Sequence, residues 1–220
     1  MLFDLRSRGR RRTVQAVYLG LAILMGGGLI LFGVGTGSGI GGLLNAFTGS
    51  GSGNQQNQVI SQQEKAAVRQ TKLTPNSPAA WAALVSARYD SASTSGFNQA
   101  TSTYTAAGKR ELAAAGDAWQ RYAQLTNNPS PTVAILAARA YGTLGQYANE
   151  ATAWETETQA SPSVVKGFEC LAISAYAAQQ TRKGDLAAAK AASMVPKANR
   201  KTLISEINTA KTQPSLAQSC

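Results

Sequence analysis

The spacing of apolar residues divides the chain into an uncharged N-terminal run and a longer segment with helical periodicity. Residues 14–34 contain no charged side chain, and Gln15 is their only strongly polar residue. A helix of this length would reach about 30 Å, which is the thickness of the hydrocarbon core of a bilayer. The pattern therefore predicts one N-terminal transmembrane helix over 14–34.

A cleaved secretory signal is the alternative interpretation of this run. The apolar core of such a signal has about 7–15 residues and is followed by small residues in an A-x-A-like pattern. Residues 36–45 offer glycines and leucines instead of such a site, so we interpret 14–34 as an uncleaved anchor. Glycines are common in membrane helices, but one face of this helix carries small residues that would let a partner helix approach closely: Ala22, Gly26 and Gly33.

The charges that flank the run predict its orientation. The basic segment 1–13 carries five arginines, and no Lys or Arg follows the run until Lys65. Because cytoplasmic flanks of membrane helices retain Lys and Arg, we expect the N-terminus in the cytoplasm and the remainder of the chain on the other side of the membrane. Anionic headgroups of the lipid bilayer would satisfy the arginines, which favours this interpretation over a nucleic-acid-binding arm.

The rest of the chain has three parts. Residues 35–58 are rich in Gly, Ser and Gln, a composition typical of a flexible linker. Over 59–212 apolar residues recur at helical spacing without the alternation of a strand, and 213–220 is expected to be a disordered tail. Prolines stand at the boundaries of the predicted helices, which cover 59–71, 78–91, 103–126, 131–144, 146–160, 164–181, 185–194 and 197–211.

The proline spacing repeats along this helical part. Pro129 and Pro162 are 33 residues apart, and Pro162 and Pro196 are 34 residues apart. Each interval holds a helix that ends in a tyrosine, then a glycine turn and a second helix. Periods of 20–50 residues are typical of stacked helical repeats, in which each unit buries one face against the next.

Several residues in these intervals resemble the motif of the tetratricopeptide repeat (TPR) family. The matching residues are aromatics, leucines, a glycine and a proline at the family's spacing: Trp81 and Leu84, Tyr141, Gly145, Tyr147, Trp154 and Pro162, and Phe168 and Leu171. The chain departs from the motif through an insertion over 91–105 and at Glu150 and Glu157, where small residues are usual. The resemblance implies an all-α fold, with an α-solenoid of TPR-like helix pairs and a C-terminal capping helix.

The overall layout also resembles a known class of proteins. A short basic start, one membrane helix and an extracytoplasmic helical-repeat domain are similar to ancillary subunits of the SecYEG translocon and to envelope chaperones. This resemblance implies a membrane-anchored protein-interaction module that assists secretion or envelope protein folding, with translocon subunits or a membrane helix among its partners. The alternative is a structural adaptor that tethers a wall-synthesis or division complex to the membrane.

Composition restricts the chemistry that the chain can perform. It has no histidine, which excludes Ser-His-Asp and Cys-His catalysis and imidazole metal sites. Glu155 and Glu157 are two residues apart and would point in different directions on a helix, and neither a Walker glycine loop nor a Cys-x-x-Cys pair is present. The net charge of +10 is split between the N-terminal arginines and a mildly basic remainder. We therefore expect no enzymatic activity, no cofactor or metal and no nucleic-acid partner.

The two cysteines leave two alternatives open. In an oxidising compartment, Cys170 and Cys220 could form a disulfide that fixes the tail to the third repeat. Alternatively, Cys170 is a core residue beside Leu171 and Cys220 lies at a frayed end. The second interpretation is favoured by the apolar surroundings of Cys170 in the sequence.

A partner-binding groove is expected on the concave side of the repeats. In stacked helix pairs the first helix of each pair lines that side. Two tyrosines, two isoleucines and two cations fall there, which suits an extended peptide with acidic ends: Tyr89, Ile135, Arg139, Lys166, Ile173 and Tyr176. The alternative is that the two tyrosines are packing residues, because the aromatic position of the repeat lies next to each.

Overall fold

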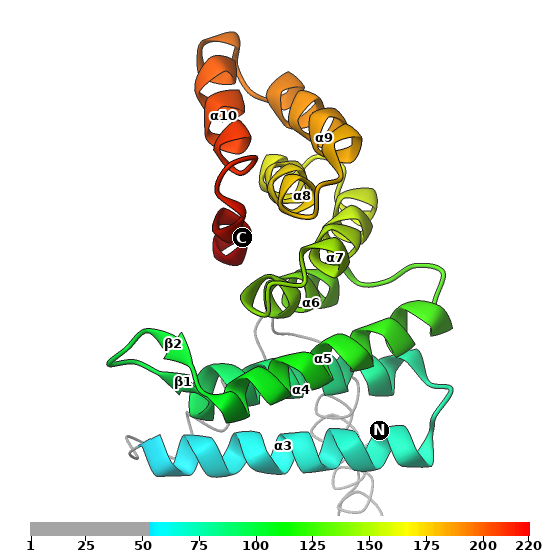
Figure 1. Cartoon of the computed structure of the whole chain (residues 1–220). Coiled ribbons are helices and arrows are strands. Elements are labelled where there is room, and N and C mark those ends of the chain that lie inside the picture. The colour runs from blue at the N-terminus through cyan, green and yellow to red at the C-terminus, as the bar shows by residue number, and fades with distance from the viewer. Residues whose placement is uncertain (1–52) are drawn as a thin grey trace, which may run out of the picture. The chain divides into compact units, whose positions relative to one another are not determined.

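The structure, a computed structural model, describes residues 53–220 (Figure 1). The basic segment 1–13, the transmembrane helix 14–34 with Ala22, Gly26 and Gly33, and most of the linker lie outside the described residues. Within 53–220, no helix is both long enough and apolar enough to cross a membrane.

Residues 53–220 are all-α, as the periodicity predicts, apart from one very short hairpin. The α-helices of this region are α3 (Gly53–Leu73), α4 (Pro78–Ser95), α5 (Ala106–Leu125), α6 (Pro131–Thr143), α7 (Tyr147–Ala160), α8 (Val165–Ala177), α9 (Thr181–Met194) and α10 (Lys197–Thr209). A 3-10 helix, η1 (Pro214–Ser219), ends the chain.

Prolines set several helix boundaries, as expected. Pro78 and Pro131 stand in the first turns of α4 and α6, and Pro196 directly precedes α10. At these positions the missing N–H of proline would have had no partner within the helix. The start of α9 differs from the prediction: the helix begins at Thr181 and not at residue 185, so it includes Gly184. Gly184 is not a turn residue but packs against the ring of Tyr176.

The insertion predicted over 91–105 forms the end of α4 and a hairpin. Strands β1 (Phe97–Asn98) and β2 (Thr103–Tyr104) pair in antiparallel register, and the rings of Phe97 and Tyr104 lie 5.0 Å apart edge to face. The hairpin projects from one end of the α4–α5 pair (Figure 1). Gly96 and Gly108 meet at its base, and their missing side chains allow α4 and α5 to come together there.

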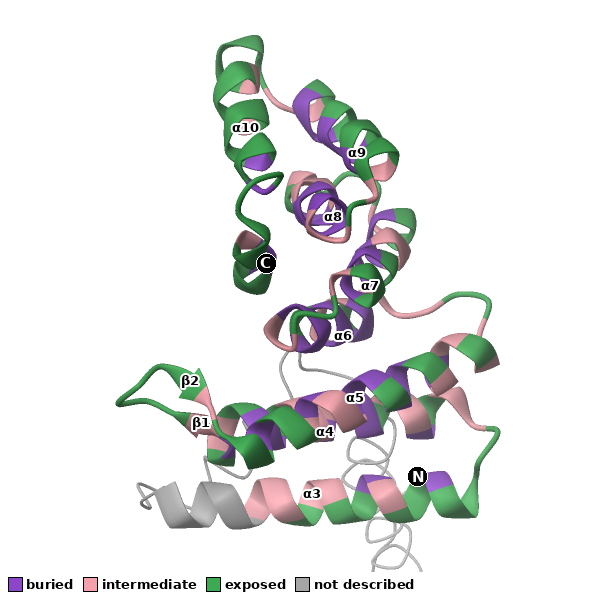
Figure 2. Ribbon diagram, in the orientation of Figure 1, coloured by how far each residue is buried: buried purple, intermediate pink, exposed green. Residues whose placement is uncertain are grey.

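Consecutive helices pack in sequential pairs. α4 packs on α5, α6 on α7 and α8 on α9, and α7 joins the second of these pairs to the third. Alanines supply much of the buried surface and allow the helix axes to approach closely. Large aromatic side chains fill the space that remains between the helices: Trp119, Tyr122, Tyr141, Trp154 and Tyr176. Figure 2 shows this buried surface running between the paired helices, with exposed residues on their outer faces.

Two glutamates occupy core positions on α7. Glu150 is 0% exposed and Glu157 is 3% exposed, at positions where the repeat motif usually has small residues. Each carboxyl group lies against a glycine of a neighbouring helix, Gly142 of α6 and Gly167 of α8. The glutamate side chains therefore fit into the core, because each lies where the neighbouring helix has no side chain.

The C-terminal residues are ordered against the rest of the domain. Cys170 of α8 and Cys220 form a disulfide with their Cα atoms 5.6 Å apart. Residues 214–219 form η1, and Ala217 and Cys220 are buried, so the expected disordered tail and frayed cysteine are corrected by the structure. The reason is covalent and apolar attachment, since the segment is bonded to α8 and packs on α6 and α8.

Candidate functional site

The C-terminal segment 214–220 lies on the face of α6 and α8 where the sequence predicts a peptide. η1 contacts both helices; Ala217 belongs to the hydrophobic core, and the partly buried Leu216 packs against it. Gln218 donates a hydrogen bond from Nε2 to the Tyr147 hydroxyl at 3.3 Å. The chain's own C-terminal segment therefore covers part of this face.

Four of the six predicted partner-binding residues lie on the helix faces that carry this segment. Arg139 is exposed and donates from Nε to the main-chain oxygen of Cys220 at 3.4 Å. Ile135 lies one turn before Arg139 on α6, so the two share a face. On α8, Lys166 and Ile173 stand four residues before and three after Cys170, and they share the face of the disulfide.

Tyr176 is a packing residue, with only 6% of its surface exposed. Its hydroxyl donates to Oδ1 of Asp185 on α9 at 2.7 Å, and Nζ of Lys211 lies 4.3 Å from the ring centroid. Burial and this hydrogen bond raise the pKa of Tyr176, and the same hydrogen bond lowers the pKa of Asp185. Ile173 is also buried, at 8%. Neither side chain offers a partner much surface while residues 207–220 are in place.

Tyr89 lies on α4 near the hairpin, next to Arg139. It is half-buried and packs on a small cluster of Ala92, Leu112 and Ala140. Burial raises the pKa of Tyr89, with a contribution from Tyr104, while the neighbouring Arg139 lowers it. The structure thus brings Tyr89 and Arg139 together and assigns Tyr89 partly to packing, the alternative that the sequence left open.

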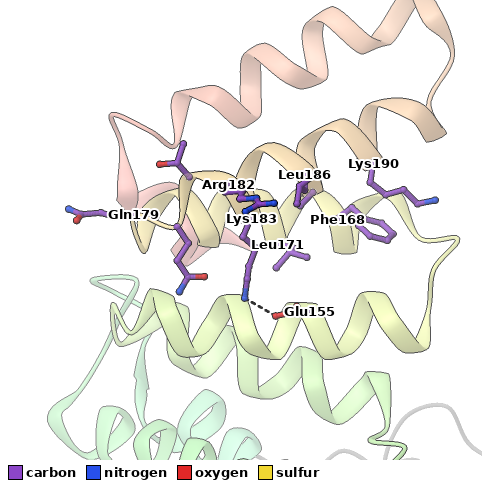
Figure 3. Close-up of a pocket in the computed structure, with 11 residues that line it drawn as sticks. Glu155, Phe168, Leu171, Gln179, Arg182, Lys183, Leu186 and Lys190 are labelled. Atoms are coloured by element: carbon purple, nitrogen blue, oxygen red, sulfur yellow. Dashed lines mark hydrogen bonds and ion pairs between the residues drawn. The ribbon is translucent and has the colours of Figure 1, made fainter.

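A second surface, which the sequence analysis missed, is an open groove between α7 and α9. Its volume is about 740 Å³. Phe168 and Leu171 of α8 form the floor, and Ala187 and Leu186 of α9 form one apolar wall (Figure 3). Leu186 is 66% exposed, so the groove presents a large apolar side chain to solvent.

Cations line the α9 side of this apolar groove. Arg182, Lys183 and Lys190 line it from α9, against a single carboxylate, Glu155 of α7. Lys183 donates to Glu155 at 2.7 Å, whereas no ion-pair partner of Arg182 or Lys190 is present among residues 53–220. Lys190 lies 5.8 Å from the centroid of the Phe168 ring. The rim therefore keeps two uncompensated positive charges beside exposed apolar surface.

One sequence signal could have located part of this groove. Arg182, Leu186 and Lys190 are spaced by four residues, so they lie along one helix face. An apolar residue between two cations on a face is an unusual pattern for an otherwise alanine-rich helix. The floor and the opposite wall come from α8 and α7, and no local pattern could have brought them to α9.

The described part of the chain offers little catalytic chemistry. No group of three or more Cys, Asp and Glu side chains within it is placed to hold a metal ion. Burial raises the pKa of Glu150 to about 7, while hydrogen bonds with Ser174 and Trp154 oppose the shift. This carboxyl group is enclosed between helices and does not line the groove.

The chain matches no protein-family model, no curated protein and no solved structure.

Proposed function

We propose that this protein is a membrane-anchored, TPR-like protein-interaction module on the extracytoplasmic side, which assists secretion or envelope protein folding near the translocon. One observation carries the proposal. The face of α6 and α8 holds a polypeptide segment, residues 214–220. The segment buries Ala217, packs Leu216 against the core, accepts a hydrogen bond from Arg139 at a main-chain oxygen and is joined to α8 by the disulfide. A surface that binds this segment has the properties needed to bind a similar peptide.

The helix pairing supports the finer fold proposal. α4–α5, α6–α7 and α8–α9 would be three TPR-like repeats, and α10 would be the cap. A cap needs one apolar face toward the last repeat and a polar outer face. In α10 only Ile207 is buried, and most of the remaining residues are exposed.

The cysteine pairing supports the proposed compartment. Disulfides form and persist in oxidising environments, such as the outside of the bacterial plasma membrane. The arginines of segment 1–13 and the apolar run 14–34 support the same topology. A protein with this topology would present its helical domain to newly translocated chains.

The proposal is tested by recovering partners of the full chain from membranes solubilised in detergent. The wild-type protein is compared with an Arg139→Glu variant and with Arg69→Glu, a control that reverses an exposed arginine on α3. Under reducing conditions, which break the disulfide, we expect wild type and Arg69→Glu to recover translocon subunits and unfolded secreted proteins, and Arg139→Glu to recover fewer of them. Recovery of wall-synthesis or division enzymes instead would support a structural adaptor and contradict the proposal.

A further inference from the structure

We propose that the groove between α7 and α9 is a second binding surface, and that it takes an amphipathic helix of a partner protein with one apolar face and acidic flanks. The inference goes beyond the proposed function, because the groove uses none of the residues that hold the C-terminal segment 214–220. It rests on three observations, which concern the shape of the groove, its apolar surface and its charge.

The shape of the groove favours a helix over an extended strand. Its walls are α7 and α9 and its floor is α8, and the turn residues Gln179 and Gln180 close one end, so most of its surface is the outer surface of helices (Figure 3). Beyond the first turn of α9, the main-chain groups of these helices are hydrogen-bonded internally and cannot form a ladder with the backbone of an extended peptide. A bound helix satisfies its own backbone and can pack its side chains between those of the walls.

The apolar surface of the groove provides contacts for such a helix. Leu186 is 66% exposed, and Phe168 and Leu171 lie below it in the floor. Exposed apolar surface rimmed by polar residues is typical of interaction sites. Leucine-sized side chains at i and i+4 of a partner would contact Leu186 and reach the floor at Phe168.

Charge then selects the partner. On α9, Arg182 lies four residues before Leu186 and Lys190 lies four residues after it. Lys183 forms an ion pair with Glu155 of α7 on the opposite wall. Acidic residues beside the apolar face of the partner would meet Arg182 and Lys190, which makes the two surfaces complementary. A basic amphipathic helix would instead place like charges together, at a cost in affinity.

A probe peptide tests this inference with the full chain purified in detergent. The probe is a labelled peptide of about 14 residues with leucines at helical i, i+4 spacing and glutamate at the other positions. A matched peptide carries lysine in place of glutamate. We expect the glutamate peptide to bind in a titration followed by fluorescence anisotropy, and the lysine peptide to bind at least roughly tenfold more weakly.

Surface variants assign the binding to the groove. We expect the affinity for the glutamate peptide to fall by roughly tenfold or more in Leu186→Gln, and likewise in the double variant Arg182→Glu with Lys190→Glu. Leu73→Gln and Arg69→Glu are matched controls, because Leu73 is 69% exposed and both residues lie on α3, outside the groove. These controls should leave the affinity of the peptide unchanged, and circular dichroism should show that all variants remain helical.

Three outcomes would overturn the inference. The first is no saturable binding of the glutamate peptide to the wild-type protein, and the second is equal binding of the two peptides. The third is that the wild-type protein binds vesicles of anionic lipid but not the peptide, and that Leu186→Gln abolishes the vesicle binding. The groove would then be a membrane-binding surface. Arg139→Glu changes the segment-covered face and none of the groove residues, so peptide binding that this variant retains separates the groove from that face.

Discussion

Gly142 of α6 lies directly against the carboxyl group of Glu150 on α7, so that a methyl group at position 142 would lie 2.9 Å from the carboxyl carbon. The glutamate is fully buried, and its Oε2 has no hydrogen-bond partner among the described residues. Its other oxygen accepts a long hydrogen bond from Nε1 of Trp154, at 3.4 Å. No cation neutralises this group within the described region, so its burial favours the protonated form.

This environment predicts that the stability of the domain decreases as the pH rises. The pKa of Glu150 is raised from 4.5 to about 7 by burial, so between these values the folded chain binds more protons than the unfolded chain. The free energy of unfolding should therefore fall as the pH rises from about 4.5 to about 7, by about 3 kcal/mol from this group. Denaturant titrations at several pH values measure the fall.

Glu150→Gln keeps the shape of the side chain and removes the ionisation. We expect this variant to lose the fall that Glu150 contributes and to be more stable than wild type at pH 8. A fall from Glu157, whose pKa burial also raises, should remain. Glu206→Gln on α10 changes an exposed glutamate and serves as the control. An identical pH dependence in wild type and Glu150→Gln would show that Glu150 is ionised without cost in the folded protein.

Gly142→Ala should destabilise the domain although alanine favours helices. Alanine is about 1 kcal/mol more favourable than glycine inside a helix. At position 142, however, its methyl group would overlap the carboxyl group of Glu150, and overpacking of this kind typically costs about 1–3 kcal/mol. Thermal unfolding followed by circular dichroism measures the net effect. The double variant Gly142→Ala with Glu150→Ala should recover part of the loss relative to the sum of the single changes. Additive effects would contradict a direct contact.

Trp154→Ala should destabilise the domain by about 3–5 kcal/mol, because the indole is 3% exposed and its removal leaves a cavity between packed helices. Chemical denaturation of the full chain gives the free energy. Trp81 is only partly buried, so Trp81→Ala should cost less. The reverse order of the two variants would argue against the packing of α7 between its neighbours.

Removal of the disulfide should both destabilise the domain and uncover the α6–α8 face. Cys170 and Cys220 are separated by 50 residues, and loop-closure entropy for this length gives about 4 kcal/mol. In the Cys170→Ser, Cys220→Ser variant we expect faster hydrogen exchange in residues 214–219 and increased binding of a hydrophobic dye. Unchanged exchange there would mean that Leu216 and Ala217 hold the segment without the covalent bond.

Local sequence determined the helices of this protein. Prolines cannot donate a hydrogen bond and stand where helices begin, and the turn between α6 and α7 has Gly145 at φ +71°, a conformation that glycine adopts without strain. Apolar spacing then predicts which segments are helical and that consecutive helices form pairs. These properties depend on a few neighbouring residues, so they can be read from the chain.

The tertiary structure decided which surfaces are free. Tyr176 has the spacing of a groove residue, but its covering groups Asp185 and Lys211 come from α9 and from the turn that follows α10. The sequence of α7 alone does not show how two of its glutamates can be buried, because the glycines that make room for them lie on other helices. Likewise, the groove at Leu186 needs its floor from α8 and a wall from α7. Each of these features depends on contacts between residues distant in the chain, which periodicity along one helix does not specify.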